Sequence, residues 1–162
     1  MIVLSIDPGI DRTGFAFFDK TGSDSCKYLA SGLIQTDKKQ SLQLRINIIY
    51  DEIRKLIAKY HPRVLVMERV FFAKNQKTAI TVGQSQGMLL LLAEQSKLKV
   101  HFFTPTEIKL AVTGYGTSDK KSVQKMLHIS LNLTQELVQD DQADAIACGY
   151  AFCCMNESLM DY

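Results

Sequence analysis

The chain has 162 residues, of which 46% are hydrophobic and 22% are charged. This balance is typical of one globular domain and excludes a disordered or fibrous protein. We expect a single domain over residues 1–162, with 155–162 as a short flexible tail. The first residues, MIVLSID, lack a basic segment, and the central apolar run at 88–93 is too short to cross a bilayer. These features predict a cytoplasmic protein without a signal peptide or membrane span.

The net charge of +2 conceals an uneven distribution along the chain. Residues 1–68 carry 10 basic and 8 acidic residues, and residues 69–125 carry 9 basic and 3 acidic residues. Residues 126–162 carry 6 acidic residues and no Lys or Arg. A basic middle beside an acidic end indicates a surface for a polyanion next to a carboxylate-rich site, although an ordinary solvated face could give a milder asymmetry.

The four cysteines show no spacing typical of a metal site or a disulfide framework. Cys26 and Cys148 are isolated, Cys153 and Cys154 are adjacent, and the three histidines are scattered. No CxxC pair is present, so a zinc site is not expected. We expect reduced cysteines in a helix or in the core of a cytosolic protein.

The first half of the chain predicts strands followed by a helix. The strands are bounded by Pro8-Gly9 and by a turn at Thr21-Gly22, and the helix ends near Pro62. Continuous apolar sequence at 64–67 is typical of a central strand covered on both faces. The expected elements are strands at 1–7, 13–19, 27–36 and 64–67, and a helix at 42–57.

The second half predicts alternating helices and one strand. Thr104-Pro105 has the form of a helix N-cap followed by proline in the first turn, and Ser118 or Asp119 could cap the next helix. The expected elements are a helix at 77–96, a strand at 99–103, two helices after 104 and 118, and a last helix at 140–156. Together these elements predict a mixed α/β sheet with helices on its faces.

Four acidic residues occupy positions where a charge is costly. Asp7 and Glu68 each end an apolar strand, and Asp141 and Asp144 lie three apart on a helix that is otherwise apolar or small. Their spacing places both helical acids on one face. Carboxylates gathered at strand ends repel one another unless a cation lies between them. Two Mg²⁺ ions about 4 Å apart, held by such acids, are the arrangement that hydrolyses phosphodiesters.

Each acid also has an ordinary structural interpretation. Asp7 before Pro8-Gly9 could be a turn residue, and Glu68 could be a surface residue at a strand end. Asp140, Asp141 and Asp144 could stabilise a helix N-terminus through the helix dipole. The functional interpretation is favoured because all of these alternatives would have to hold together.

Several segments spread along the chain form a recognisable set in their order. They are SIDPGIDRTGFA at 5–16, MERVFFAKN at 67–75, GQSQG at 83–87, Thr104-Pro105, Lys109, VTGYG at 112–116, DKKSVQ at 119–124 and DQADAIA at 141–147. Taken jointly, these segments resemble the RuvC-type Holliday junction resolvases of bacteria, and the resemblance runs from residue 1 to about residue 152.

The resemblance implies a ribonuclease-H-like fold with a five-stranded mixed sheet, and a homodimer that nicks four-way DNA junctions symmetrically. It implies that Mg²⁺, for which Mn²⁺ could substitute, is bound by Asp7, Glu68, Asp141 and Asp144. It also assigns DNA contacts to one loop and two lysines: Phe71, which would stack on an exposed base, Lys74, Asn75, Lys109 and Lys120. A branch-migration complex of the RuvA and RuvB type is an expected partner.

The basic and aromatic assignments have plain alternatives. Phe71 could pack in the core, and Lys109 or Lys120 alone could be solvated. Gly83 and Gly87 lie on one helical face where another helix could approach, and the resemblance places the dimer interface near this helix.

The sequence departs from the family pattern at three places. Arg69 stands where a neutral amide is common, Asp140 adds a second acid beside Asp141, and the C-terminus lacks a basic tail.

Three rival functions are kept as alternatives. The first is a ribonuclease-H-like nuclease acting on RNA, as in the YqgF family, which lacks the 71–75 loop. The second is a sugar-kinase or actin-like ATPase, because Asp7-Pro-Gly and Thr13-Gly resemble a phosphate-binding hairpin. The third is a junction-binding module without catalysis, which four retained acids disfavour.

Overall fold

The computed structural model describes residues 1–22, 26–69, 76–133 and 139–154. The strands are β1 (Ile2–Asp7), β2 (Arg12–Lys20), β3 (Cys26–Gln35), β4 (Val64–Glu68) and β5 (Lys99–Phe103). The helices are α1 (Leu42–Tyr60), α2 (Gln76–Gln95), α3 (Pro105–Thr113), α4 (Lys120–Leu131) and α5 (Asp140–Cys154). The expected elements are confirmed with shifts of a few residues at their ends; the tail at 155–162 lies outside the described residues.

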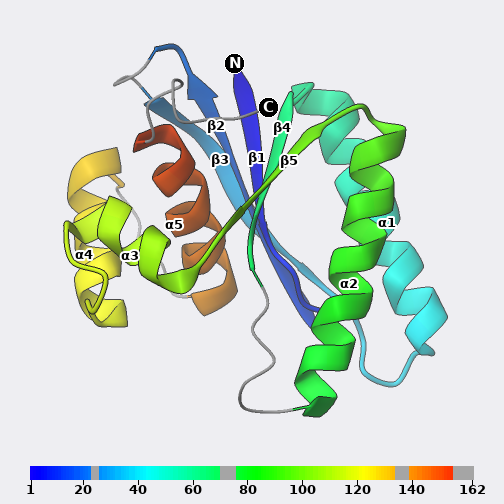
Figure 1. Ribbon diagram of the computed structural model, residues 1–162. Coiled ribbons are helices and arrows are strands. Elements are labelled where there is room, and N and C mark those ends of the chain that lie inside the picture. The colour runs from blue at the N-terminus through cyan, green and yellow to red at the C-terminus, as the bar shows by residue number, and fades with distance from the viewer. Residues whose placement is uncertain (23–25, 70–75, 134–138, 155–162) are drawn as a thin grey trace.

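The five strands form one mixed sheet in the order β3-β2-β1-β4-β5. β1 to β3 are antiparallel neighbours, whereas β4 and β5 run parallel to β1. Helices cover both faces: α1 and α2 lie on one side, and α3, α4 and α5 lie on the other (Figure 1). The predicted mixed α/β architecture is therefore confirmed.

β4 shows why a short, continuously apolar run predicts a central strand. Val64 and Val66 belong to the core beneath α3–α5, and Leu65 and Met67 belong to the core beneath α1 and α2. Successive side chains of a strand point to opposite faces. A strand between two cores must therefore be apolar at every position.

Local capping fixes the ends of the helices. Thr104 and Glu107 form a capping box at the start of α3, with Pro105 in its first turn. Asp119, rather than Ser118, caps α4 by accepting a hydrogen bond from the Ser122 backbone N–H at 2.8 Å. α1 ends where His61 adopts a left-handed conformation just before Pro62.

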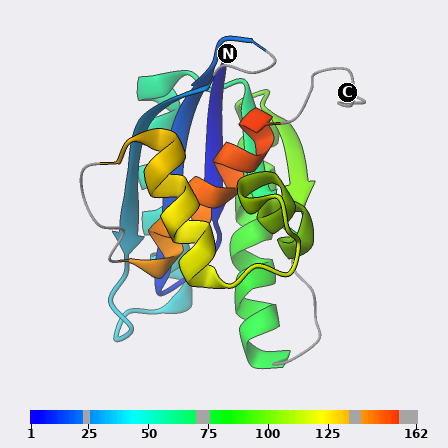
Figure 2. The same ribbon diagram turned by 90° about the vertical axis from the view of Figure 1, so that its left-hand side faces the viewer.

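α5 crosses the sheet with its first turn at the carboxyl ends of β1 and β4 (Figures 1 and 2). Its nine buried residues include four alanines and Gly149, where an added Cβ would come within 2.4 Å of the Phe18 ring. Small residues thus allow α5 to lie close to the sheet.

The expectation that all cysteines are reduced was wrong for one pair. Cys26, at the start of β3, forms a disulfide with Cys153, at the end of α5, across 127 residues of sequence. The packing of α5 beside β3 brings these distant residues together, and no spacing motif in the sequence predicts that they pair. Cys148 and Cys154 are free. No helix in the described part of the chain is long and apolar enough to cross a membrane.

Candidate active site

Two of the four predicted acids lie side by side at one edge of the sheet. β1 ends at Asp7 and β4 ends at Glu68, and the parallel register pairs Ile6 with Met67. α2 supports this edge from the other side. The Ser85 hydroxyl donates to the Gly9 carbonyl at 3.4 Å, and the Gln86 amide donates to the Glu68 carbonyl at 3.3 Å.

α5 delivers the other two acids to the same edge. Asp141 and Asp144 lie in its first turns, and the Ser5 hydroxyl in β1 donates to the Ala145 carbonyl at 2.7 Å. Gly14 in β2 lies directly beneath this turn, since an added Cβ would come within 1.9 Å of the Asp141 carbonyl oxygen. The start of α5 is therefore tied to the strands that carry Asp7 and Thr13.

The pKa of Asp7 is raised by its burial and by the nearby charges of the other three acids. Burial, followed by the charges of Asp144, Asp141 and Glu68, raises the pKa of Asp7 from 3.8 to about 7, against a lowering by Lys120. Desolvation and like charges both disfavour an ionised carboxylate. Without a bound cation, the ionised form of the Asp7 carboxyl group is therefore strongly disfavoured.

The pKa values of Glu68 and Asp144 are raised as well. For Glu68 the causes are burial and then repulsion by Asp144, with Lys109 and Lys120 acting in the opposite direction. For Asp144 burial raises the pKa, and the hydrogen bond and charge of Lys120 partly offset it. Lys109 and Lys120 thus lie close enough to the acids for their charges to lower the pKa of a carboxyl group.

Lys120 contacts the acids directly. Its Nζ lies 3.1 Å from Asp144 Oδ2 and 3.4 Å from Asp140 Oδ1. Burial lowers the pKa of Lys120, but the hydrogen bonds and charges of Asp144 and Asp140 outweigh it, so the net shift is upward. Lys120 is thus a fixed positive charge at the carboxylate edge.

A second cation in the site was not predicted. The Arg12 Nε lies 2.9 Å from Asp141 Oδ2. Arg12 and Gly14 are two apart in β2, and therefore face the same side of the sheet, toward α5. This alternation was readable from the sequence, but the position of Asp141 above Gly14 was not.

The chemistry of the acids fits a hard divalent cation. Among the described residues, no three His, Cys, Asp or Glu side chains lie close enough to enclose an ion. Asp141 and Asp144 are instead paired with Arg12 and Lys120. Yet the donors are all carboxylates, which suit Mg²⁺. Asp141 Oδ2 is buried and accepts no hydrogen bond from the described residues. An ion at this edge would satisfy that oxygen and relieve the repulsion on Asp7.

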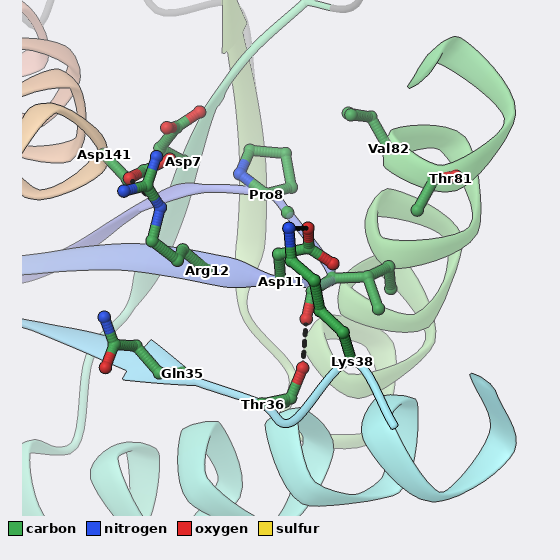
Figure 3. A pocket seen from close by; sticks show the side chains of 12 residues that line it. Asp7, Pro8, Asp11, Arg12, Gln35, Thr36, Lys38, Thr81, Val82 and Asp141 are labelled. Atoms are coloured by element: carbon green, nitrogen blue, oxygen red, sulfur yellow. Dashed lines mark hydrogen bonds and ion pairs between the residues drawn. The ribbon is translucent and has the colours of Figure 1, made fainter. Parts of the chain in front are cut away.

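A cavity of about 920 Å³ extends from these acids toward α2. Asp7, Arg12 and Asp141 lie together at one end, and Thr81 and Val82 of α2 lie across from them (Figure 3). Lys38 and Thr36 line the wall between, beyond the end of β3. The cavity is lined by both acidic and basic side chains, among them Asp7, Asp141, Arg12 and Lys38.

The predicted DNA contacts divide into two groups. Lys109 and Lys120 lie beside the acids, whereas Phe71, Lys74 and Asn75 lie outside the described residues. In the sequence, that segment lies between the end of β4 at Glu68 and the start of α2 at Gln76.

Comparison with known proteins places the chain in a family. The model for crossover junction endodeoxyribonuclease RuvC matches residues 3–153. The chain is 40% identical to the enzyme of that name from Pseudothermotoga lettingae over 153 residues, covering 94% of each protein. It is 41% identical to that from Thermosipho melanesiensis over 150 residues, covering 93% of this chain and 95% of the relative.

A solved structure agrees with the sequence relatives. Thermus thermophilus RuvC, in complex with a Holliday junction substrate, superposes with a TM-score of 0.87 at 25% identity, covering 93% of this chain and 92% of that one. The matches to the family model, to the relatives and to this structure show that the chain belongs to the RuvC family of crossover junction endodeoxyribonucleases, with a ribonuclease-H-like fold.

Proposed function

We propose that this enzyme resolves Holliday junctions in recombination and repair by two symmetric nicks, using Asp7, Glu68, Asp141 and Asp144 to hold Mg²⁺. The observation that carries the proposal is the gathering of these acids at one edge, where burial and repulsion hold the pKa of Asp7 near 7. The complex of the Thermus thermophilus relative with a Holliday junction supports the choice of substrate.

The acids and lysines have distinct proposed roles. Two bound Mg²⁺ or Mn²⁺ ions would supply Lewis-acid chemistry, which lowers the pKa of an attacking water and stabilises in-line displacement. Asp7 and Glu68 present oxygens from the sheet, and Asp141 and Asp144 present them from α5. Lys109 and Lys120 would neutralise negative charge on the phosphate during the reaction.

The segment Phe71–Asn75 is proposed to meet the branch point. Its flanks, Glu68 and Gln76, lie at the acidic edge and at the start of α2. Phe71 would stack on a base freed at the junction, an interaction worth about 1–3 kcal/mol. Lys74 and Asn75 would contact the backbone nearby.

The outward face of α2 is the proposed homodimer interface. Ile80 is 63% exposed and Leu91 is 58% exposed. Among the described residues, no atom lies within 4 Å of a Cβ added at Gly83 or Gly87. An apolar stripe with two bare glycines allows a second helix to approach closely. A two-fold dimer would present two sites to a nearly two-fold junction and so nick opposing strands.

The enzyme is proposed to act in the bacterial cytoplasm, where chromosomal junctions form. A branch-migration complex of the RuvA and RuvB type is the proposed partner, and membership of the RuvC family supports it. Faster resolution of a mobile junction with such a complex present would support this partner.

The decisive experiment uses synthetic DNA and matched variants. An immobile junction, a mobile junction and a linear duplex are incubated with Mg²⁺ or EDTA, and sequencing gels locate the cuts. We expect paired nicks in the junctions only, with Mg²⁺ only, and none with Asp7→Asn. Asp51→Asn, which removes a carboxylate from the surface of α1, should cut normally. Equal cutting of linear duplex, or no cutting of any DNA, would refute junction resolution and favour RNA processing.

A further inference from the structure

Arg12 occupies a position that the roles above leave unexplained. It begins β2 on the face toward α5, two residues before the glycine on which the Asp141 backbone lies. Its Nε is 2.9 Å from Asp141 Oδ2, yet that oxygen accepts no hydrogen bond from the described residues. The contact is therefore a charge pair without an aligned N–H, held in place by the packing of α5 on β2.

The pair cannot persist unchanged in a metal-loaded site. A carboxylate oxygen that binds a divalent ion gives up much of its attraction for a neighbouring guanidinium, because the added positive charge repels it. Arg12 is 49% exposed on its side chain and Asp141 is 22% exposed, so Arg12 can turn outward while Asp141 stays. Displacement from Asp141 would leave Arg12 free to bind another anion.

The structure supplies the place where that anion would lie. Arg12 lines the cavity that leads away from Asp7 and Asp141 (Figure 3). A DNA strand whose phosphate reaches the acids must carry its neighbouring phosphates past this wall. A planar guanidinium matches two phosphate oxygens and stays charged at every working pH.

We propose that Arg12 exchanges partners: it pairs with Asp141 in the metal-free enzyme and binds a DNA phosphate beside the scissile one once a divalent ion holds Asp141. The inference rests on the metal site of the proposed function. Arg12 is then a positioning residue that couples metal binding to DNA binding. A metal ion on Asp141 frees Arg12 for the DNA phosphate, and a phosphate on Arg12 frees Asp141 for the metal ion.

The coupling predicts opposite effects of one substitution. Without DNA, Arg12→Ala should bind Mn²⁺ about two- to fivefold more tightly, because a half-exposed competing charge is gone. With Ca²⁺ present it should bind the junction about tenfold more weakly, because a charge-assisted phosphate contact is lost. In EDTA its junction affinity should match that of the wild type within about twofold, because Arg12 is then engaged with Asp141.

Lys38 provides a matched control in the same cavity. It is 76% exposed and pairs at 2.9 Å with Asp11, which is not among the four acids. Lys38→Ala should leave Mn²⁺ affinity unchanged and alter junction affinity equally in Ca²⁺ and EDTA. Arg12→Lys, which keeps the charge without the planar fork, should fall between Arg12→Ala and wild type in both assays.

Calorimetry measures the affinity for Mn²⁺. Fluorescence anisotropy with a labelled junction measures DNA affinity in Ca²⁺ or EDTA over a salt series, and gels check that the DNA stays intact. The slope of log affinity against log salt should fall by about one for Arg12→Ala in Ca²⁺ only. An unchanged or weaker Mn²⁺ affinity, or equal junction losses in Ca²⁺ and EDTA, would overturn the exchange. If wild-type protein binds neither ion nor junction, the proposed function fails with it; if it binds both, only the role of Arg12 is at stake.

Discussion

Asp7→Asn should stabilise the metal-free enzyme at neutral and alkaline pH, although it removes a proposed ligand. Burial and three neighbouring acids raise the pKa of Asp7 from 3.8 to about 7 in the folded protein. Between pH 3.8 and about pH 7, Asp7 of the folded protein still holds a proton that the unfolded chain has released. The free energy of unfolding of the wild type therefore falls as pH rises through this window, and the loss is complete above about pH 7.

The size of the effect follows from the shift. A change of one unit in pKa corresponds to about 1.4 kcal/mol. The raised pKa of Asp7, roughly three units above 3.8, therefore lowers the free energy of unfolding of the wild type by about 4 kcal/mol at pH 8. Asparagine has nearly the same shape and no charge, so the variant avoids this loss. We expect Asp7→Asn to be more stable than wild type by about 2 kcal/mol at pH 5 and by about 4 kcal/mol at pH 8.

Urea unfolding in EDTA at several pH values between 5 and 8 measures this difference. Asp51→Asn controls for the loss of one carboxylate at the surface of α1. Saturating Mg²⁺ should narrow the gap at pH 8, since a ligand that binds only the folded wild type stabilises it selectively. A gap that does not widen with pH, or a variant less stable than wild type at pH 8, would refute the claim that Asp7 is held under burial and repulsion.

Three other predictions concern different parts of the molecule. Gly87→Arg should leave the monomer folded, because no described atom lies within 4 Å of a Cβ added there, but it should dissociate the proposed dimer in analytical ultracentrifugation. Leu110→Arg, at a residue 54% exposed on α3, should stay dimeric, and a dimeric Gly87 variant would move the interface elsewhere. Cys26→Ser removes the disulfide and should lower the free energy of unfolding by about 2–4 kcal/mol under oxidising conditions. Cys154→Ser changes a free cysteine and should not lower it, so equal effects of the two substitutions would show that the disulfide does not stabilise the fold. Phe71→Ala should slow junction cleavage more than it weakens binding, and equal cleavage rates on one junction would remove Phe71 from the mechanism.

The elements and the acidic edge could be predicted because their signals are local. Apolar runs end at Asp7 and Glu68, and parallel strands bring such ends to one edge of a sheet. Spacing alone places Asp141 and Asp144 on one helical face. The capping pattern at Thr104-Pro105 also depends only on neighbouring residues, and the structure confirms it.

The features that sequence reasoning missed depend on packing between distant segments. Cys26 meets Cys153 only because the start of β3 lies beside the end of α5. Arg12 meets Asp141 only because α5 rests on Gly14. Neither pair has a spacing that a single sequence would mark, since 127 or more residues separate the partners.

Residues that touch neither metal nor DNA nevertheless set the geometry of the site. An added Cβ at Gly14 would come within 1.9 Å of the Asp141 carbonyl oxygen, and one at Gly149 would come within 2.5 Å of the Ser5 hydroxyl. The same hydroxyl donates to the Ala145 carbonyl and so fixes the height of α5 above β1. The proposed ion site requires carboxylates held within fractions of an ångström, so these small residues determine whether Asp141 could take part in it. The apolar core is thus what forces four mutually repelling acids together, and the raised pKa of Asp7 is the electrostatic consequence.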